Sequence, residues 1–282
     1  MVTEKAYAKL NLSLNITEKR IDGFHNLESI MVPVSDLYDI LEFEVRDDNQ
    51  FIIVDDIVCN NIILKAAKLF QEKYHIKGAN IKLTKRIPME AGLAGGSADA
   101  SATLRGLNKL YKLNIPLLEL EELAASLGSD TVFCLYNKAA ICRGRGEILE
   151  FIEFDFEFEC YILKPSFGLL TKEVFSNYIF QETNIKTNEI VSSLKFNNLK
   201  VLNNLISNDL YLAAIKVNPL IKEIVDVFKE NGVISHMSGS GSTLFVINDG
   251  VCDKLLTNIL VNNKVEYAYL GKHLIKSTVI DW

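Results

Sequence analysis

The chain of 282 residues is 49% hydrophobic and 23% charged, and its formal net charge is −6. This mixture excludes a disordered chain and a membrane protein, and the length suffices for about two ordinary domains. No run reaches the roughly 18–20 apolar residues that cross a bilayer, and the N-terminus lacks the apolar core of a signal peptide. The acidic balance disfavours a nucleic-acid partner, because binding a phosphate backbone needs a basic face. We therefore expect a cytoplasmic protein with neither membrane nor nucleic acid as its partner.

The sequence contains five cysteines and no CxxC pair, which disfavours both a zinc site and a disulfide framework. We expect reduced and mostly buried thiols at Cys59, Cys134, Cys142, Cys160 and Cys252. The four histidines are equally scattered, and their spacing predicts no set of metal ligands.

The first predicted element is a strand over 6–16. Apolar side chains occupy every second position and polar ones the positions between, which predicts one buried and one exposed face. Because side chains two residues apart in a strand lie on the same face, we expect Lys9 and Asn11 side by side on the polar face. Two further strands are predicted over 38–45 and 81–85.

Helices are predicted wherever apolar residues recur at helical spacing, namely over 61–74, 97–111, 117–127 and 219–231. Gly128 stands where the C-cap of the third of these helices is expected. The polar stretch at 181–209 favours helices joined by loops, and a strand is predicted over 243–247. Strands and helices therefore intermix in an α+β fold, and we place a domain boundary between residues 1–155 and 156–282.

The segment 88–99, PMEAGLAGGSAD, is rich in glycine and runs into the predicted helix at Ser97. Glycines let a backbone approach a ligand closely, and the free N–H groups at a helix start attract phosphate. Ser97 and Ser101 offer hydroxyls to phosphate or magnesium, and Lys85 and Arg86 offer positive charge. The alternative is an ordinary glycine-rich turn with Ser97 as the N-cap. The motif is neither a P-loop nor a dinucleotide fingerprint.

Asp130 and Lys9 are candidates for catalysing phosphoryl transfer, which needs a group that accepts or orients the proton of the nucleophile. Asp130 follows Gly128 and precedes an apolar run, so we expect it at an accessible helix-to-strand junction. A neighbouring lysine would keep its carboxylate ionised. The alternatives are a turn or N-cap aspartate and a solvated lysine, and the residues alone leave them open.

Three segments carry a resemblance to the GHMP kinase superfamily: AYAKLNLSLNI at 6–16, PMEAGLAGGSADAS at 88–101 and MSGSGSTLF at 237–245. The segment KRIDGFHNLESIMVPVSDLYDIL at 19–41 is similar to the branch that acts on a cytidine-diphosphate-linked methylerythritol, and LGSD and GRGE agree. The resemblance implies a two-domain fold. Its N-terminal domain is ribosomal-protein-S5-domain-2-like and carries the ATP loop, and its C-terminal domain is ferredoxin-like.

The resemblance also implies roles for individual residues. Lys9 and Asp130 match the catalytic pair. The ATP-binding positions are matched by Asn61, Lys85, Pro88, Gly92, Leu93, Ala94, Gly95, Gly96, Ser97 and Ala98. The substrate-binding positions are matched by Asn11, Phe24, His25, Thr171 and Phe175. Phe24 replaces the usual tyrosine beside the cytosine ring, which keeps a ring face for stacking and loses the hydroxyl.

The implied activity is ATP-dependent phosphorylation of the 2-hydroxyl of the cytidylated methylerythritol in non-mevalonate isoprenoid biosynthesis, with Mg²⁺ bridging the ATP phosphates. The partners are then two small molecules, ATP and this substrate. One alternative is a GHMP kinase for a smaller polyol or amino alcohol, although such a substrate has no base to stack on Phe24. The other is a non-catalytic nucleotide-binding relative, which the presence of both Lys9 and Asp130 disfavours.

Overall fold

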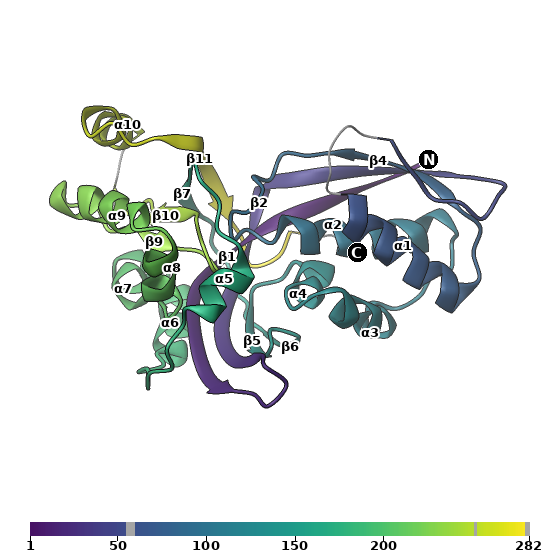
Figure 1. Ribbon diagram of the computed structural model, residues 1–282, viewed down its shortest axis with the longest axis horizontal. Helices are drawn as coiled ribbons and strands as arrows, with labels where there is room; N and C mark the ends of the chain where they lie inside the picture. The colour runs from purple at the N-terminus through teal and green to yellow at the C-terminus, as the bar shows by residue number, and fades with distance from the viewer. Residues whose placement is uncertain (55–59, 251–252, 280–282) are drawn as a thin grey trace.

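The computed structural model describes residues 1–54, 60–250 and 253–279. Figure 1 shows two groups of helices joined by a long, curved pair of strands, β1 (Val2–Lys19) and β2 (His25–Val45). These strands pair antiparallel, and their register shifts after Tyr7, Asn11 and Ile16. Such irregularities bend a strand and increase its twist. The bent hairpin thereby passes from one group of helices to the other.

The first group of helices lies against a sheet built around β2. The strands β4 (Ala79–Thr84) and β5 (Ala140–Gly144) pair antiparallel with different parts of β2, and β3 (Ile52–Val54) and β6 (Ile148–Phe151) extend the sheet. The helices of this group are α1 (Asn60–Tyr74), α2 (Gly95–Leu110), α3 (Leu117–Leu127) and α4 (Thr131–Tyr136). Gly106 lets α2 lie directly on the Phe43 ring of β2, because a Cβ there would come within 2.2 Å of the ring.

The second part of the chain forms an antiparallel sheet in the order β11 (Tyr267–Ile275), β7 (Phe158–Pro165), β10 (Leu244–Ile247) and β9 (His236–Met237). The strand β8 (Ser207–Asn208) pairs instead with β1, in parallel. The helices of this part are α5 (Thr171–Ser176), α6 (Thr187–Lys195), α7 (Leu199–Leu205), α8 (Tyr211–Val217), α9 (Leu220–Glu230) and α10 (Asp253–Asn262). None of the helices in the described ranges combines the length and apolar composition needed to cross a bilayer.

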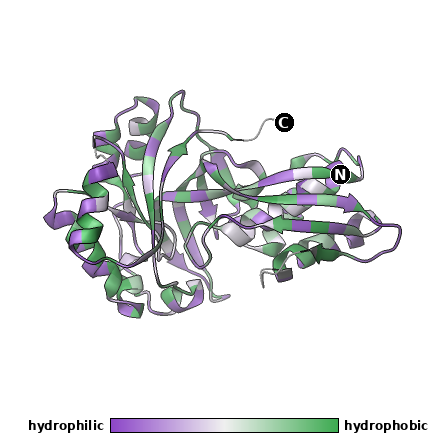
Figure 2. Ribbon diagram, turned by 90° about the horizontal axis from the view of Figure 1, so that it is seen from above, coloured by the Kyte–Doolittle hydropathy of each residue, from purple (hydrophilic) through white to green (hydrophobic). Residues whose placement is uncertain are grey.

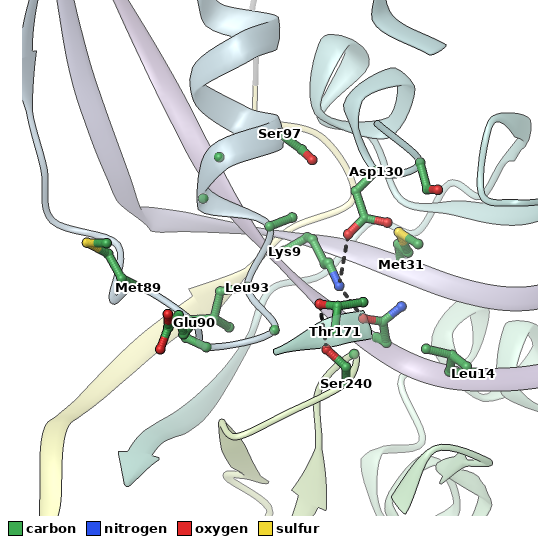
Figure 3. A pocket seen from close by; sticks show the side chains of 18 of the residues that line it. Lys9, Leu14, Met31, Met89, Glu90, Leu93, Ser97, Asp130, Thr171 and Ser240 are labelled. Atoms are coloured by element: carbon green, nitrogen blue, oxygen red, sulfur yellow. Dashed lines mark hydrogen bonds and ion pairs between the residues drawn. The ribbon is translucent and has the colours of Figure 1, made fainter. Parts of the chain in front are cut away.

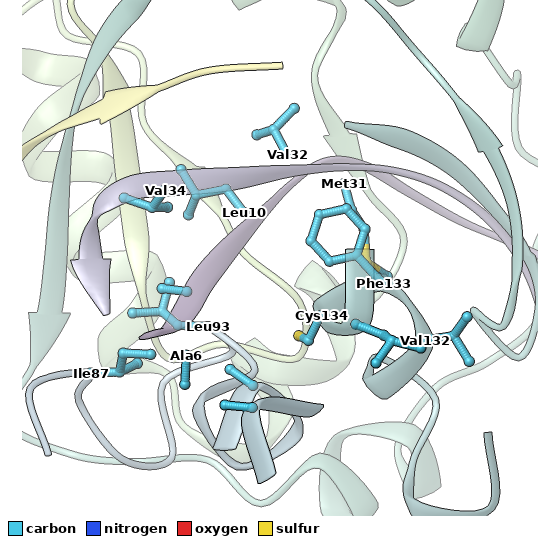
Figure 4. Close-up of a cluster of buried hydrophobic side chains, with 14 of the residues drawn as sticks. Ala6, Leu10, Met31, Val32, Val34, Ile87, Leu93, Val132, Phe133 and Cys134 are labelled. Carbon is cyan, nitrogen blue, oxygen red and sulfur yellow. The ribbon is translucent and has the colours of Figure 1, made fainter. Parts of the chain in front are cut away.

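The buried apolar side chains form two clusters, and β1 contributes to both. Leu10 and Leu12 belong to the larger cluster beneath α2 and α4, part of which is drawn in Figure 4. Leu14 and Ile16, further along the same strand, belong to the cluster of the second part. Figure 2 shows polar and hydrophobic residues interleaved along the strands and outer helices, as expected where one face packs on a core.

The predicted strand over 6–16 is confirmed within β1, but the expected exposed face is wrong. Lys9 and Asn11 are each only 2% exposed, and Ser13 and Asn15 are buried as well. The reason is that later chain packs against these side chains. A Cβ at Gly239 of the second glycine turn, before β10, would lie only 3.2 Å from Lys9 Nζ, and Asn15 Nδ2 donates to Ser207 Oγ and Asp209 Oδ1. A polar strand face is therefore closed by chain that follows it by more than 190 residues.

The other predicted helices and strands are confirmed with shifted ends, and the helix over 117–127 is confirmed without a shift. The strand predicted over 38–45 is only the last part of β2, and residues 25–37 of that strand are not predicted by the sequence. The helix expected from Ser97 begins two residues earlier, at Gly95. The apolar run after Asp130 is wrong as a strand, because it forms the short helix α4. Cys134, Cys142 and Cys160 are buried free thiols, whereas Cys59 and Cys252 lie outside the described residues. The boundary at 155/156 falls between β6 and β7 and stays a prediction.

Candidate active site

A cavity of about 640 Å³ lies between the glycine-rich loop, β1, the start of α4, helix α5 and the second glycine turn. Most of the predicted site residues line it: Lys9, Asn11, Asn61, Lys85, Pro88, Gly92, Leu93, Ala94, Gly95, Gly96, Ser97, Asp130, Thr171 and Phe175. Figure 3 shows side chains from both parts of the chain converging on it. Phe24, His25 and Ala98 are not among the lining residues.

Lys9 belongs to the wall of this cavity. Its Nζ donates to Asn11 Oδ1 at 2.5 Å and lies 3.4 Å from Asp130 Oδ2, as the dashed lines in Figure 3 mark. The side chain of Lys9 is 3% exposed and that of Asp130 is 27% exposed. The lysine is therefore held by protein groups, while the carboxylate remains within reach of a ligand.

Asp130 occupies the N-cap position of α4, yet its side chain makes no capping hydrogen bond. The carboxylate instead points to Lys9. An N-cap aspartate ordinarily satisfies a free N–H group of its own helix. The side chain of Asp130 therefore does not cap α4, and its carboxylate is directed into the cavity.

The glycine-rich loop enters α2 through Ala94, which has a left-handed φ of 58°. The first helical hydrogen bond runs from Ala98 N to Ala94 O, so the N–H groups of the preceding turn have no partner within the helix. Gly95 and Gly96 belong to that turn and line the cavity. This arrangement is suited to an anion, and it replaces the alternative in which Ser97 is the N-cap.

The two serines near the loop have different positions. Ser97 lines the cavity. Ser101 is fully buried, and its hydroxyl donates to Thr131 O at 2.6 Å, which joins α2 to α4. Of these two hydroxyls, only that of Ser97 faces the cavity.

Gly92 brings the loop against the second glycine turn. Its φ is 70°, and a Cβ at this position would lie 2.3 Å from Ser238 O. The Ser238 hydroxyl donates to Gly92 O at 3.1 Å, and Thr243 N donates to Ala91 O at 3.3 Å. The loop and the turn therefore form one unit across the cavity wall.

Lys85 lines the cavity, but two buried carboxylates hold its ammonium. Nζ lies 2.6 Å from Asp39 Oδ2 and 2.6 Å from Asp99 Oδ2. Burial opposes the charge of this ammonium, but Asp99 and Asp39 outweigh it and raise the pKa of Lys85. Arg86 lies over the ring of Tyr38 at 5.5 Å. The positive charge expected from Lys85 and Arg86 is therefore largely engaged within the protein.

Asp99 belongs to the same buried group. Burial raises the pKa of its carboxyl to about 7, against the lowering effect of Lys85, and Asp39 adds to the rise. Asp99 Oδ1 is buried without a hydrogen-bond partner. Asp39 Oδ1 accepts from the backbone N–H groups of Arg86 and Ile87. Asp39 thus binds the chain just before the glycine-rich loop, and Asp99 links the helix after the loop to Lys85.

An aromatic group marks the other end of the site. The rings of His25 and Phe175 lie 5.4 Å apart, and Tyr178 meets His25 edge-on at 5.8 Å. Burial, with a smaller contribution from Lys19, lowers the pKa of His25. Phe24 is 52% exposed, and the guanidinium of Arg145, a cavity-lining residue, lies 5.3 Å from its ring.

Several residues that organise the site were not predicted. Asp39 carries a usable signal, since it lies on the same strand face as Leu37 and Leu41, where an isolated carboxylate indicates a buried partner. Ser29, whose hydroxyl accepts from Asn11 Nδ2 at 2.8 Å, carries no such signal, because a single serine in an apolar stretch is ordinary. No group of three or more His, Cys, Asp or Glu side chains suited to a metal ion occurs among the described residues.

Comparisons with known proteins agree with this geometry. Residues 61–138 match the family model described as GHMP kinases N terminal domain. The 4-diphosphocytidyl-2-C-methyl-D-erythritol kinase of Macrococcus caseolyticus is 38% identical and matches 87% of this chain and 89% of its own. The enzyme of the same name from Clostridium botulinum (strain Alaska E43) is also 38% identical, with 97% of this chain and 99% of its own covered.

Solved structures extend the likeness to the whole fold. A crystal structure of 4-(cytidine 5'-diphospho)-2C-methyl-D-erythritol kinase superposes with a TM-score of 0.81 at 27% identity, covering 98% of this chain and 99% of the other. The L. major mevalonate kinase in complex with R-mevalonate shares the fold, with a TM-score of 0.70 at 15% identity over 99% and 97% of the two chains. The α+β, two-domain fold of the GHMP kinases is thereby confirmed. By its sequence relatives and its fold, the chain belongs to the 4-diphosphocytidyl-2-C-methyl-D-erythritol kinase family of the GHMP kinases.

Proposed function

We propose that this protein transfers the γ-phosphoryl group of ATP to the 2-hydroxyl of 4-diphosphocytidyl-2-C-methyl-D-erythritol. The observation that carries the proposal is the Lys9–Asp130 pair, which faces the same cavity as the glycine-rich loop. A nucleophile and an ATP γ-phosphate bound in this one cavity would meet beside the carboxylate. Family membership supplies the identity of the acceptor.

The ATP phosphates would lie on the loop 92–98, where the first-turn N–H groups of α2 and the helix dipole favour negative charge. Ala98 is buried and would contribute through its backbone. Asn61 and Pro88 line the same cavity and would contact the nucleoside. Lys85 would hold the start of α2 in place, since its ammonium already joins Asp39 of β2 to Asp99 of α2.

In the reaction, the 2-hydroxyl oxygen forms a bond to the γ-phosphorus, and the bond between that phosphorus and the β–γ bridging oxygen breaks. ADP leaves with the electron pair, and Asp130 accepts the hydroxyl proton. The ammonium of Lys9 forms an ion pair with this carboxylate and lies where it would stabilise negative charge on the attacking oxygen. Positioning and charge stabilisation carry most of the catalysis in phosphoryl transfer.

A magnesium ion fits this site as a companion of the nucleotide. Mg²⁺ is commonly held by substrate phosphates with one or two protein oxygens, and it then supplies charge neutralisation. The Ser97 hydroxyl and the Asp130 carboxylate are among the oxygens that line the cavity, and they would hold such an ion together with the phosphates. The absence of a cluster of three acidic or histidine ligands among the described residues fits an ion held mainly by phosphate.

The cytidine part of the substrate would lie against the aromatic group at the other end of the cavity. Phe175 and Thr171 line the cavity from α5, and the Thr171 hydroxyl is 3.0 Å from that of Ser240. His25 and Phe24 would complete the base site beside Phe175, and Asn11 would contact the polyol. We place the protein in the cytoplasm, which suits the buried free thiols of Cys134, Cys142 and Cys160.

The test is ADP release, measured in a coupled assay with three acceptors: the cytidylated methylerythritol, mevalonate and homoserine. We expect kcat/KM for the first acceptor to exceed the other two by at least about a hundredfold, because its base has contacts that they lack. Preference for a smaller alcohol would identify a different GHMP kinase. ATP binding without ADP release from any acceptor would identify a non-catalytic relative.

A further inference from the structure

A chain of buried hydrogen bonds continues from Lys9 away from the cavity. Lys9 Nζ donates to Asn11 Oδ1, Asn11 Nδ2 donates to Ser29 Oγ at 2.8 Å, and Ser29 Oγ donates to Ser13 O at 2.5 Å. Asn11 is 2% exposed and Ser29 is fully buried. Water therefore has little access to these groups, and each polar atom depends on its protein partner.

The direction of every bond in this chain is fixed by its two ends. A lysine ammonium only donates, and a backbone carbonyl only accepts. The single hydroxyl proton of Ser29 is used on Ser13 O, so Ser29 Oγ presents only lone pairs to Asn11. The Asn11 carboxamide must then turn its NH₂ group to Ser29, which leaves its oxygen facing Lys9.

We propose that Ser29 is a positioning residue that orients the Asn11 carboxamide and, through it, the ammonium of Lys9 beside Asp130. This inference deepens the proposed function and rests on it. With the amide reversed, an NH₂ group would face an ammonium and two donors would meet. Lys9 would then lose its hydrogen bond to Asn11 and be held by Asp130 alone. Directional chains of this kind also strengthen one another where the local dielectric is low.

Ser13 provides a matched control on the neighbouring strand. Its hydroxyl is 1% exposed and accepts from Ile30 N at 3.1 Å, but it makes no hydrogen bond to Asn11. Ser13→Ala therefore removes a buried hydroxyl between the same two strands and keeps the carbonyl that Ser29 uses. Ser29→Thr keeps the hydroxyl at the position under test.

The first experiment compares turnover of Ser29→Ala, Ser29→Thr, Ser13→Ala and the wild-type chain with the cytidylated methylerythritol. We expect Ser29→Ala to lower kcat by about tenfold while KM for ATP stays within about twofold, as a misplaced catalytic group implies. Ser29→Thr and Ser13→Ala stay within about twofold of wild type in both constants. A purely structural role would lower the stability of Ser29→Ala and Ser13→Ala alike without this selective loss of kcat.

The second experiment does not depend on the substrate. Hydrogen exchange of the Asn11 side-chain NH₂ is followed by ¹⁵N NMR, with its resonance identified from the spectrum of Asn11→Asp. We expect exchange at least about tenfold faster in Ser29→Ala and unchanged in Ser13→Ala, because only the first change removes the acceptor. Unchanged exchange and kcat in Ser29→Ala would overturn the inference. A wild-type chain inactive on this acceptor would defeat the proposed function alone, since the NMR comparison still decides the role of Ser29.

Discussion

At the scale of single residues, activity should depend most strongly on the Lys9–Asp130 pair. Asp130→Asn keeps the size of the side chain but removes the proton acceptor, so we expect kcat to fall by about 100-fold to 10,000-fold. Binding of ATP should change little, because the loop that receives its phosphates is intact. The coupled ADP assay and an ATP titration measure the two effects.

Asp226→Asn on the exposed side of α9 is the control, since Asp226 pairs with Lys222 and is not among the residues that line the cavity. Full turnover in a folded Asp130→Asn protein would remove Asp130 from the reaction. Lys9→Met tests the partner in the same assay, with an equally large loss expected because the buried ammonium beside Asp130 is gone.

The buried carboxylate of Asp99 makes stability depend on pH. Burial raises its pKa to about 7 in the folded chain, from an ordinary value near 3.8. Between about pH 5 and pH 7 the folded state therefore holds a proton that the unfolded chain has released. The contribution of this group is largest at low pH and is lost as the pH rises through about 7, by about 1.4 kcal/mol per pH unit in that window.

Asp99→Asn imitates the protonated carboxyl, so this part of the pH dependence should vanish in the variant. Urea unfolding at several values between pH 5 and pH 8 gives the free energy of unfolding for both proteins. The difference between the two pH profiles isolates the contribution of Asp99, because the rest of the chain is the same in both proteins. Parallel pH profiles for the two proteins would contradict the assignment.

At this scale the sequence predicts residues that stand inside local motifs and misses partners that only the fold supplies. Lys9, Asn11 and Asp130 are recognisable because each stands in a short, characteristic segment. The engagement of Lys85 is not predictable in the same way, because Asp39 lies 46 residues away and reaches it through strand pairing. The polar contacts of Ser238 depend likewise on the closure of the second part of the chain over β1.

At the scale of elements, the contact between the glycine-rich loop and the second glycine turn depends on Gly92. Gly92→Ala should strain the left-handed backbone and push the loop from Ser238 O, which a Cβ would approach to 2.3 Å. We expect a loss of stability of about 1–3 kcal/mol and a higher KM for ATP. Urea unfolding and ATP titration measure these effects.

Gly96→Ala is the control for stability, because Gly96 lies in α2 and a Cβ there would meet no atom within 4 Å. An alanine there should leave stability unchanged or raise it by up to about 1 kcal/mol. Equal stability of the Gly92→Ala and Gly96→Ala proteins would show that the loop is free to move away from the turn.

Element types follow from the sequence when a segment is long and periodic. The helix over 117–127 is of this kind, with a glycine after its last residue. The six residues of α4 are not, because a short apolar run fits a buried strand and a helix equally well. The prediction of an exposed face on β1 is wrong for another reason. An alternating pattern shows which face of a strand is polar, but it does not show whether later parts of the chain pack over that face.

At the scale of the whole molecule, β1 and β2 tie the two buried clusters together. Leu10 and Leu14 of one strand lie in different clusters, and Ile30 and Leu27 of the other strand do the same. The sequence predicts part of each strand, over 6–16 and 38–45, but not residues 25–37 of β2, which include Leu27 and Ile30. Nor does it show that the two strands span two cores, because that depends on which side chains from later in the chain pack against them. The cavity lies where this shared hairpin passes between the parts.

A shared hairpin predicts that the two parts lose structure together. Phe228 of α9 is 2% exposed in the second cluster, so Phe228→Ala should cost about 3–5 kcal/mol. We expect kinase activity and far-ultraviolet circular dichroism to fall at the same urea concentration, lower than in wild type, although Phe228 is not among the residues lining the cavity. Lys229→Ala, on the exposed side of α9, should change the free energy of unfolding from either measurement by no more than about 0.5 kcal/mol. A dichroism plateau after loss of activity would mean that the second part unfolds alone, and β1 would then not couple the two cores.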